Sequence, residues 1–254
     1  MSVFLSGFAS LVGHIADLLQ PVFQGGATAA AIILFTACVR LAVHPLSRAA
    51  ARGQKARTKL SPQIAELRKK HSKNPERLQK AIMELHKKEQ VSPLSGCLPS
   101  LLQLPAFFLM YHLFSSREIG GKPNELLGHS LGAAPLGERW KDALADGGIF
   151  GGAGLVYVAL FAIVVVVATF NYRRTKRQMA TMPTPAAGPD GQPMPGMGAM
   201  TKLMPLLSFA TLLTVGVVPL AAALYVVTST TWTAVERAFL YRDVPAPGAL
   251  ATAA

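Results

Sequence analysis

Acidic residues and cysteines are scarce in this chain. Its 254 residues include 13 aspartates and glutamates against 25 lysines and arginines, and only 2 cysteines. Because Cys38 and Cys97 both fall in apolar runs, we expect two reduced packing residues rather than a disulfide framework. The motifs H-E-x-x-H of zinc peptidases and C-x-x-C of thiol–disulfide enzymes are also missing from the sequence. These absences favour a protein that is not an enzyme and that uses no metal or cofactor.

The first 24 residues lack the features of a leader sequence. They contain no basic n-region, no small-residue cleavage site and no lipoprotein cysteine. Apolar residues recur at helical spacing from Val3 to Leu19, ahead of Pro21. Residues 1–24 are therefore predicted to form an outer helix that lies in the membrane interface.

Hydrophobic sequence is what the chain has in excess. Hydrophobic residues make up 51% of it and charged residues 15%, and the mean hydropathy is +0.35 although the pI is near 10.1. The charge is therefore segregated from long apolar runs. We predict an all-α integral membrane protein with five transmembrane helices, at residues 25–45, 94–115, 149–170, 203–216 and 218–240.

The charged segments between these spans predict an orientation. Residues 46–92, residues 171–202 and the end of the chain from Arg237 carry 20 basic residues, whereas the opposite side carries only Arg117, Lys122, Arg139 and Lys141. The positive-inside rule then places the N-terminus outside and the C-terminus in the cytoplasm. In this orientation residues 116–148 form an outer loop, residues 171–202 a cytoplasmic loop and residues 241–254 a cytoplasmic tail.

Residues 46–92 are predicted to form a basic, antiparallel helical hairpin in the cytoplasm. Asn74 and Pro75 supply the turn, with Asn74 as the N-cap of the second helix and Pro75 as its first residue. Pro62 should kink the first helix or restart it with Ser61 as its cap. A narrow apolar seam joins the two helices, at Leu60, Ile64, Leu67, Leu78, Ile82 and Leu85. The basic side chains either form a solvated face or bind anionic headgroups or ribosomal RNA.

One arginine lies inside an apolar span. Arg40 is in the half of the 25–45 span nearer to Pro45. A cation inside hydrocarbon costs several kcal/mol unless it meets water, a partner or the membrane surface. Thr36 and His44 lie four residues on either side, so the three side chains form one polar stripe. Such a stripe indicates the wall of a polar cavity.

Polar side chains also mark two later spans. Ser100 and Gln103 share one face of the 94–115 span, in which Pro99 and Pro105 each free a backbone carbonyl. In the last span one face carries Tyr225, Thr228, Ser229 and Trp232. A lone glutamine more often bonds a neighbouring helix, and membrane hydroxyls usually bond their own backbone. The stripes together predict a cavity lined by Arg40, Thr36, His44, Gln103, Ser100, Tyr225, Thr228 and Ser229.

Several motifs resemble those of one family in order and spacing. They are R-L-x-x-x-P-L at 40–46, N-P-x-x-L-Q at 74–79, V-x-P-L-x-G-C-L-P at 91–99, L-L-Q-x-P at 101–105 and the segment 219–225 with Ser229. Across residues 25–242 the chain resembles the YidC-type membrane protein insertases, the YidC/Oxa/Alb family. It departs from the family's last motif at Ala221, Ala222 and Val226.

This resemblance implies a cradle of five helices around a hydrophilic groove that opens to the cytoplasm and the inner leaflet, with the family's groove arginine at Arg40. It implies a multi-pass protein of a bacterial plasma membrane that inserts nascent membrane proteins and helps them fold. The lipid bilayer, the ribosome and the Sec translocon are further implied partners, and DNA is not. We expect the short bacterial form, without the large extracytoplasmic domain of some members.

A small channel or transporter is the alternative function. Such proteins also have several helices with polar stripes, but the spans, with the last counted to Trp232, contain no Asp or Glu for ion coupling. No half of the chain repeats the other. An intramembrane protease is a more remote alternative, because His44 and His112 lie near opposite ends of their spans.

Six methionines are interspersed with prolines and glycines between residues 179 and 204. This composition indicates either a disordered linker or an adaptable apolar contact for passing segments.

Overall fold

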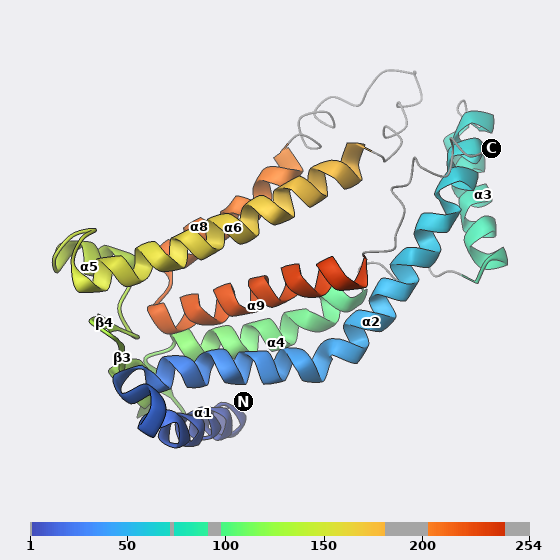
Figure 1. The fold of residues 1–254 in the computed structure, drawn as a ribbon. Coiled ribbons are helices and arrows are strands. Elements are labelled where there is room, and N and C mark those ends of the chain that lie inside the picture. Colours follow the sequence, from blue (N-terminus) through green and yellow to red (C-terminus); the bar gives the residue numbers. More distant parts are fainter. Residues whose placement is uncertain (1, 72–73, 91–97, 181–202, 242–254) are drawn as a thin grey trace. The chain divides into compact units, whose positions relative to one another are not determined.

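The computed structural model of the protein describes residues 2–71, 74–90, 98–180 and 203–241 (Figure 1). The chain divides into two compact units. The first unit consists of Met1–His44, Leu102–Thr169 and Phe209–Val235. The second consists of Pro45–Leu101, Phe170–Ser208 and Glu236–Ala254. The methionine-rich segment between residues 181 and 202 lies outside the described residues.

The chain begins with two helices. Helix α1 spans Ser2–Phe23, close to the predicted range, and includes Pro21. The short 3-10 helix η1 (Gln24–Gly26) leads directly into α2, which spans Ala27–Lys70. α2 contains both Pro45 and Pro62 and stays helical on either side of each. Of the two outcomes predicted at Pro62, the restart at Ser61 is therefore wrong and the kink stays a prediction. Each proline removes one backbone hydrogen bond, and the flanking turns keep the helix.

Helices α3 and α4 follow. α3 spans Pro75–Lys88, and its N-cap Asn74 accepts a hydrogen bond from the Arg77 N–H at 3.0 Å through Oδ1. The N-cap and the proline at the first helical position are as the sequence predicts. α4 spans Leu98–Ser115. Near its C-terminal end, the carbonyl of Leu113 accepts a hydrogen bond from Asn124 Nδ2 at 2.8 Å. The motif residues 91–97, with Cys97, lie outside the described residues.

Residues 116–148 contain two small β-ladders, which the sequence did not predict. β1 (Glu118–Ile119) pairs with β2 (Lys122–Pro123), and β3 (Ser130–Leu131) pairs with β4 (Ala134–Pro135), both antiparallel. Gly120 and Gly121 have φ of 62° and 79°, the positive values that a two-residue turn between such strands needs. The 3-10 helix η3 (Glu125–Gly128) and the helix α5 (Trp140–Ala145) complete this segment. The chain is mostly helical rather than strictly all-α.

The remaining helices differ from the predicted spans at their ends. α6 spans Gly152–Ala180 and so continues ten residues past the predicted end at 170. The predicted fourth span begins as the 3-10 helix η4 (Met204–Phe209) and becomes α-helical only in α8 (Ala210–Val217). Pro205, which lacks an N–H, sits in the 3-10 part. α9 spans Leu220–Leu240, close to the prediction.

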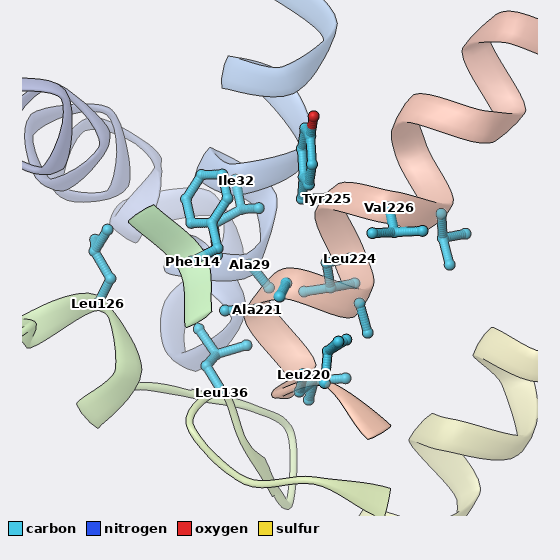
Figure 2. Close-up of a cluster of buried hydrophobic side chains, with 14 of the residues drawn as sticks. Ala29, Ile32, Phe114, Leu126, Leu136, Leu220, Ala221, Leu224, Tyr225 and Val226 are labelled. Carbon is cyan, nitrogen blue, oxygen red and sulfur yellow. The ribbon is translucent and has the colours of Figure 1, made fainter. Parts of the chain in front are cut away.

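The core of the first unit lies where α2, α4 and α9 run side by side (Figure 1). Figure 2 shows Ile32 of α2 and Phe114 of α4 beside the first turns of α9, with Leu136 packed below them. Residues 220–223 of α9 have no exposed surface. Three of them are alanines, and small side chains let helices approach closely in membranes. α9 is thus the central helix of this unit.

Large apolar side chains remain exposed along several helices. On α6 they are Leu155, Val158, Ile163, Val165, Val166 and Phe170. Two described stretches are long and apolar enough to cross a bilayer, Leu5–Leu60 and Gly152–Arg177, and Met204–Val217 is a shorter apolar stretch. Large exposed apolar surface of this kind suits contact with lipid. The mostly helical fold with candidate membrane helices agrees with the predicted class, while five crossings and a cytoplasmic hairpin stay predictions.

Cys38 is a correction to the expected packing. It is a free cysteine whose side chain is exposed, so it does not fill the interior. Ile33, Leu34 and Leu41 of the same helix are also exposed. Cys38 therefore belongs to the outward face of α2, which the apolar run alone could not distinguish from the inward face.

Candidate functional site

Arg40 is tied to α9 by its guanidinium group. Its Nε donates to the hydroxyl oxygen of Ser229 at 3.0 Å. Its Nη2 donates to the carbonyl oxygen of Ser229 at 3.0 Å and to the hydroxyl oxygen of Thr233 at 2.9 Å, and it also bonds the Ser229 hydroxyl. All of these atoms belong to the first unit. The planar guanidinium presents several donors in a fixed geometry, which is what lets one side chain bind adjacent turns of a helix.

The acceptors on α9 form a small network of their own. The Thr233 hydroxyl donates to the Ser229 carbonyl at 2.9 Å while it accepts from Arg40. Ser229 is buried and Arg40 is half-buried. The oxygens of Ser229 and Thr233 are neutral, and their bonds orient the guanidinium against α9.

Tyr225 lies next to this network on the same face of α9. Its hydroxyl is close enough to Arg40 and Ser229 to interact electrostatically with both. Figure 2 shows that the hydroxyl points away from Leu220 and the apolar cluster. The Tyr225 ring contacts Phe107 and Phe114 of α4, each with centroids 6.0 Å apart. These ring contacts pack Tyr225 of α9 against α4 beside the polar site.

Thr36 and His44 flank Arg40 on α2, but their environments differ. Thr36 is only 2% exposed, and its hydroxyl donates to the Ile32 carbonyl at 2.7 Å. That bond keeps the hydroxyl within its own helix. His44 and Thr228 are half-buried. The side chains of Ser100 and Gln103 lie outside the described residues, although both residues belong to α4.

Thr233 is the site residue that the sequence did not single out. It lies four residues after Ser229, so it occupies the next turn of the same face. A hydroxyl in a membrane helix is a weak signal, because it usually bonds its own backbone. The sequence did offer one signal for Thr233: it forms an i, i+4 pair of hydroxyls with Ser229, in a chain where another span carries a lone arginine.

The opposite end of the first unit is closed by backbone bonds to the start of α9. The N–H of Leu220 donates to the Glu138 carbonyl and the N–H of Ala221 to the Leu136 carbonyl, both at 2.9 Å. The Tyr157 hydroxyl of α6 also donates to the Glu138 carbonyl, at 2.7 Å. The first N–H groups of a helix have no partner within it, so these carbonyls satisfy donors that would otherwise be buried and unpaired.

The predicted hairpin residues are found in the second unit. Asn74 caps α3 as described above, and Leu78 and Leu85 are half-buried. Leu60 of α2 is 4% exposed and His86 of α3 is 8% exposed. Along α3 the half-buried positions Leu78, Ile82 and Leu85 recur every three or four residues, which is the spacing of one helix face. The side chain of Pro75 lies outside the described residues.

One hydrolase pattern does occur in the sequence, and the structure gives it no catalytic setting. Gly128–Gly132 reads G-H-S-L-G and so matches G-x-S-x-G. A nucleophile elbow needs a sharp turn from a strand into a helix. Ser130 instead opens the two-residue strand β3, which runs back antiparallel as β4. Within the described residues no group of three or more His, Cys, Asp or Glu could hold a metal ion.

The fold and this site define a mostly helical membrane protein in which a cation is held between two helices by neutral oxygens. A family model described as "60Kd inner membrane protein" matches residues 19–247. The chain belongs to this family, the YidC/Oxa group of membrane proteins. The resemblance seen in the motifs is thereby confirmed.

Three relatives show how much of a longer protein the match covers. "Membrane protein insertase YidC" of Clostridium perfringens is 38% identical over 115 residues, which are 45% of this chain and 48% of the relative. The protein of that name from Polynucleobacter asymbioticus is 34% identical over 128 residues, 47% of this chain and 23% of the relative. The one from Chlamydia caviae is 40% identical over 109 residues, 43% of this chain and 14% of the relative. The match thus spans less than half of each relative.

Proposed function

We propose that this chain is a membrane protein insertase, which inserts nascent membrane proteins and helps them fold. Family membership and the printed names of the relatives support this proposal. No observation favours the alternative of a small channel or transporter. The proposed location is a bacterial plasma membrane, crossed by five helices, with the N-terminus outside and the C-terminus in the cytoplasm. Positive charges between the apolar runs support this orientation.

The observation that carries the mechanism is the attachment of Arg40 to Ser229 and Thr233. The bonds fix a positive charge inside the first unit, which is otherwise built around an apolar core. In the proposed orientation this charge lies in the inner half of the bilayer. A groove lined by Arg40, Tyr225, Ser229 and the predicted positions Ser100, Gln103 and Thr228 would be open to cytoplasmic water.

Electrostatics explain how such a site would lower the barrier to insertion. A nascent membrane protein must pass its polar, often acidic, outer tail through hydrocarbon, where an isolated charge is unfavourable by several kcal/mol. A fixed guanidinium with hydroxyl neighbours solvates the tail for part of the way. The attached apolar segment then moves sideways into lipid, and its transfer contributes about 25 cal/mol per Å² of apolar surface removed from water. No nucleotide hydrolysis or covalent step is needed.

The partners proposed for the second unit follow from its charge. Residues 46–92 carry 13 of the chain's 25 basic residues. This surface would receive substrates or bind a ribosome, and the Sec translocon is a further proposed partner.

The test uses cells depleted of their own insertase and a single-span substrate with an acidic outer tail. The full chain with Arg40→Lys should retain much of the insertion, because the positive charge remains although the forked bonding is lost. Arg40→Glu should abolish it. Insertion by Arg40→Glu at the wild-type level would show that the charge has no role.

A substrate variant separates the electrostatic role from a structural one. When the acidic residues of the substrate tail are replaced by neutral ones, insertion should depend much less on Arg40. If Arg40→Glu impairs both substrates equally, the arginine serves only to hold α2 against α9.

A further inference from the structure

Basic and aromatic residues gather where α6 and α9 end, in the second unit. On α6, Phe170 and Tyr172 are followed by a run of cations, Arg173, Arg174, Lys176 and Arg177. In α9, Arg237 is followed by Phe239, and Tyr241 comes directly after the helix. We call the five cations, Arg173, Arg174, Lys176, Arg177 and Arg237, the α6–α9 basic cluster.

Arg174 joins the ends of the two helices. Its Nη1 donates to the carbonyl oxygen of Arg237 at 3.0 Å, in the last turn of α9. Its guanidinium carbon lies 5.2 Å from the centroid of the Tyr241 ring. Lys176 makes a similar contact with Tyr172, 5.9 Å from Nζ to the ring centroid. These contacts bring cations from two distant parts of the sequence into one place.

The charge of the cluster is strongly one-sided. Residues 170–180 contain no acid, and Glu236 is the only acid between 233 and 241. The guanidinium groups of Arg174 and Arg237 are within electrostatic range of each other. The side chains of Arg173, Lys176, Arg177 and Arg237 are exposed. Like charges held close together are stabilised by an anion that binds several of them at once.

We propose that the α6–α9 basic cluster binds the phosphate of an anionic phospholipid headgroup. The ligand chemistry is a phosphate ester, which arginines bind with paired N–H donors. The neighbouring surface favours a lipid as its source. Phe170 is 41% exposed on α6 and Phe239 is 72% exposed on α9, so each helix carries an exposed apolar side chain within three residues of a cation of the cluster. Tyrosines beside cations at the end of an apolar helix mark a membrane interface.

This site lies outside the proposed insertion site and does not depend on it. Neither Arg40 nor its partners Ser229 and Thr233 belong to the second unit. Lipid bound here would fix the depth at which the ends of α6 and α9 sit in the membrane. The cluster could therefore bind lipid even if the chain inserted no substrate.

Native mass spectrometry of the full chain in nonionic detergent tests the proposal. The protein is titrated with phosphatidylglycerol or with phosphatidylcholine that has the same acyl chains. The variant Arg173→Gln/Lys176→Gln/Arg177→Gln keeps Arg174, which holds the end of α9. Each juxtamembrane cation strengthens binding to an anionic surface, so this variant should bind phosphatidylglycerol at least about tenfold more weakly. Its weak binding of phosphatidylcholine should not change.

The matched control removes the same charge from another helix of the same unit. Lys80→Gln/Lys87→Gln/Lys88→Gln changes three exposed lysines of α3. This control should bind phosphatidylglycerol within about twofold of the wild type, because its lysines lie outside the α6–α9 basic cluster. A twofold change corresponds to less than about 0.5 kcal/mol of binding free energy. An equal loss in both variants would show that binding follows net charge, and would overturn the site.

A second titration uses sodium phosphate and glycerol phosphate to distinguish a lipid from a soluble phosphate. These should compete with phosphatidylglycerol only weakly, because they lack acyl chains to contact the neighbouring apolar residues. Full displacement by either one at equal concentration would overturn the assignment to a lipid.

Discussion

Thr230 and Thr233 lie three residues apart on α9, and their hydroxyls bind different partners. Thr230 donates to the carbonyls of Val226 and Val227, at 2.8 and 3.1 Å, and so bonds only its own helix. Thr233 accepts from Arg40 at 2.9 Å. The same chemical change at the two positions therefore isolates the bond to the arginine.

We predict that Thr233→Val lowers the free energy of unfolding by about 1.5–3 kcal/mol, the usual contribution of a hydrogen bond to a charged group. The isosteric valine keeps the packing. Thr230→Val should change stability by less than about 1 kcal/mol, because only a bond within the helix is lost. Reversible unfolding of the full chain in detergent measures both. Equal effects at the two positions would show that the Arg40 bond contributes nothing.

Tyr157 contributes a single hydroxyl to the closed end of the first unit. Its ring packs against Trp140, with centroids 5.5 Å apart, and its hydroxyl reaches the Glu138 carbonyl. Tyr157→Phe keeps the ring and should lower the free energy of unfolding by about 1 kcal/mol. Tyr111→Phe is the control, because the Tyr111 ring stacks on Phe107 and would keep that contact. A fall in melting temperature confined to Tyr157→Phe is the expected result.

At the residue scale the sequence pointed to much of the Arg40 site. A single arginine in an apolar run has few stable environments, so Arg40 could be identified from its surroundings alone. Ser229 and Tyr225 were named because they share a helical face, and they do lie together beside Arg40. Thr233 was missed because its partner is 193 positions away in the chain, and helical spacing carries no such information.

The start of α3 shows how a helix is fixed by local chemistry. Asn74 accepts from the Arg77 N–H, and Pro75 needs no hydrogen bond at the first position. We predict that Asn74→Ala destabilises the first turn by about 1 kcal/mol. Hydrogen exchange of the Arg77 amide should then become roughly fivefold faster if exchange follows this opening. Asn74→Ser, which keeps an acceptor at the cap, should exchange nearly as the wild type does.

The start of α6 depends on close backbone approach instead. A Cβ at Gly154 would lie 2.6 Å from the carbonyl oxygen of Ile149, and closer still to that of Gly148. Gly154→Ala should therefore lower the free energy of unfolding by about 1–3 kcal/mol, as overpacking does. Gly13→Ala is the matched control on α1, where nothing lies within 4 Å of the added carbon. It should be neutral or should stabilise the protein by up to about 1 kcal/mol.

At the scale of helices and strands, the sequence predicts features that depend on adjacent residues but not those that depend on tertiary contacts. The N-cap of α3 follows from two adjacent residues, so the sequence predicts it. The ladders between residues 118 and 135 depend on turns with positive φ and on packing in the first unit. The continuation of α2 through Pro62 likewise depends on its surroundings, because proline in isolation disfavours a helix interior by about 3 kcal/mol.

The whole molecule is organised by the separation of charge from apolar sequence. Only two described stretches meet the length and composition of a membrane span by themselves. α8 has eight residues and is too short, and α9 carries the hydroxyl-rich run Thr228–Thr233, which lowers its hydropathy. In a five-helix bundle such helices are stabilised by their neighbours. The number of crossings and their direction are therefore properties of the assembled molecule rather than of any single run.

Orientation can be tested with two exposed lysines on opposite sides of the predicted membrane. In a chain with Cys38→Ala and Cys97→Ala, one variant carries Lys122→Cys in β2 and another carries Lys87→Cys in α3. A membrane-impermeant maleimide should label the first in intact cells and the second only after lysis, because basic segments are retained in the cytoplasm. The reverse pattern would place Arg40 in the outer half of the bilayer. It could not then meet a tail that enters from the cytoplasm, and the proposed mechanism would fail with the orientation.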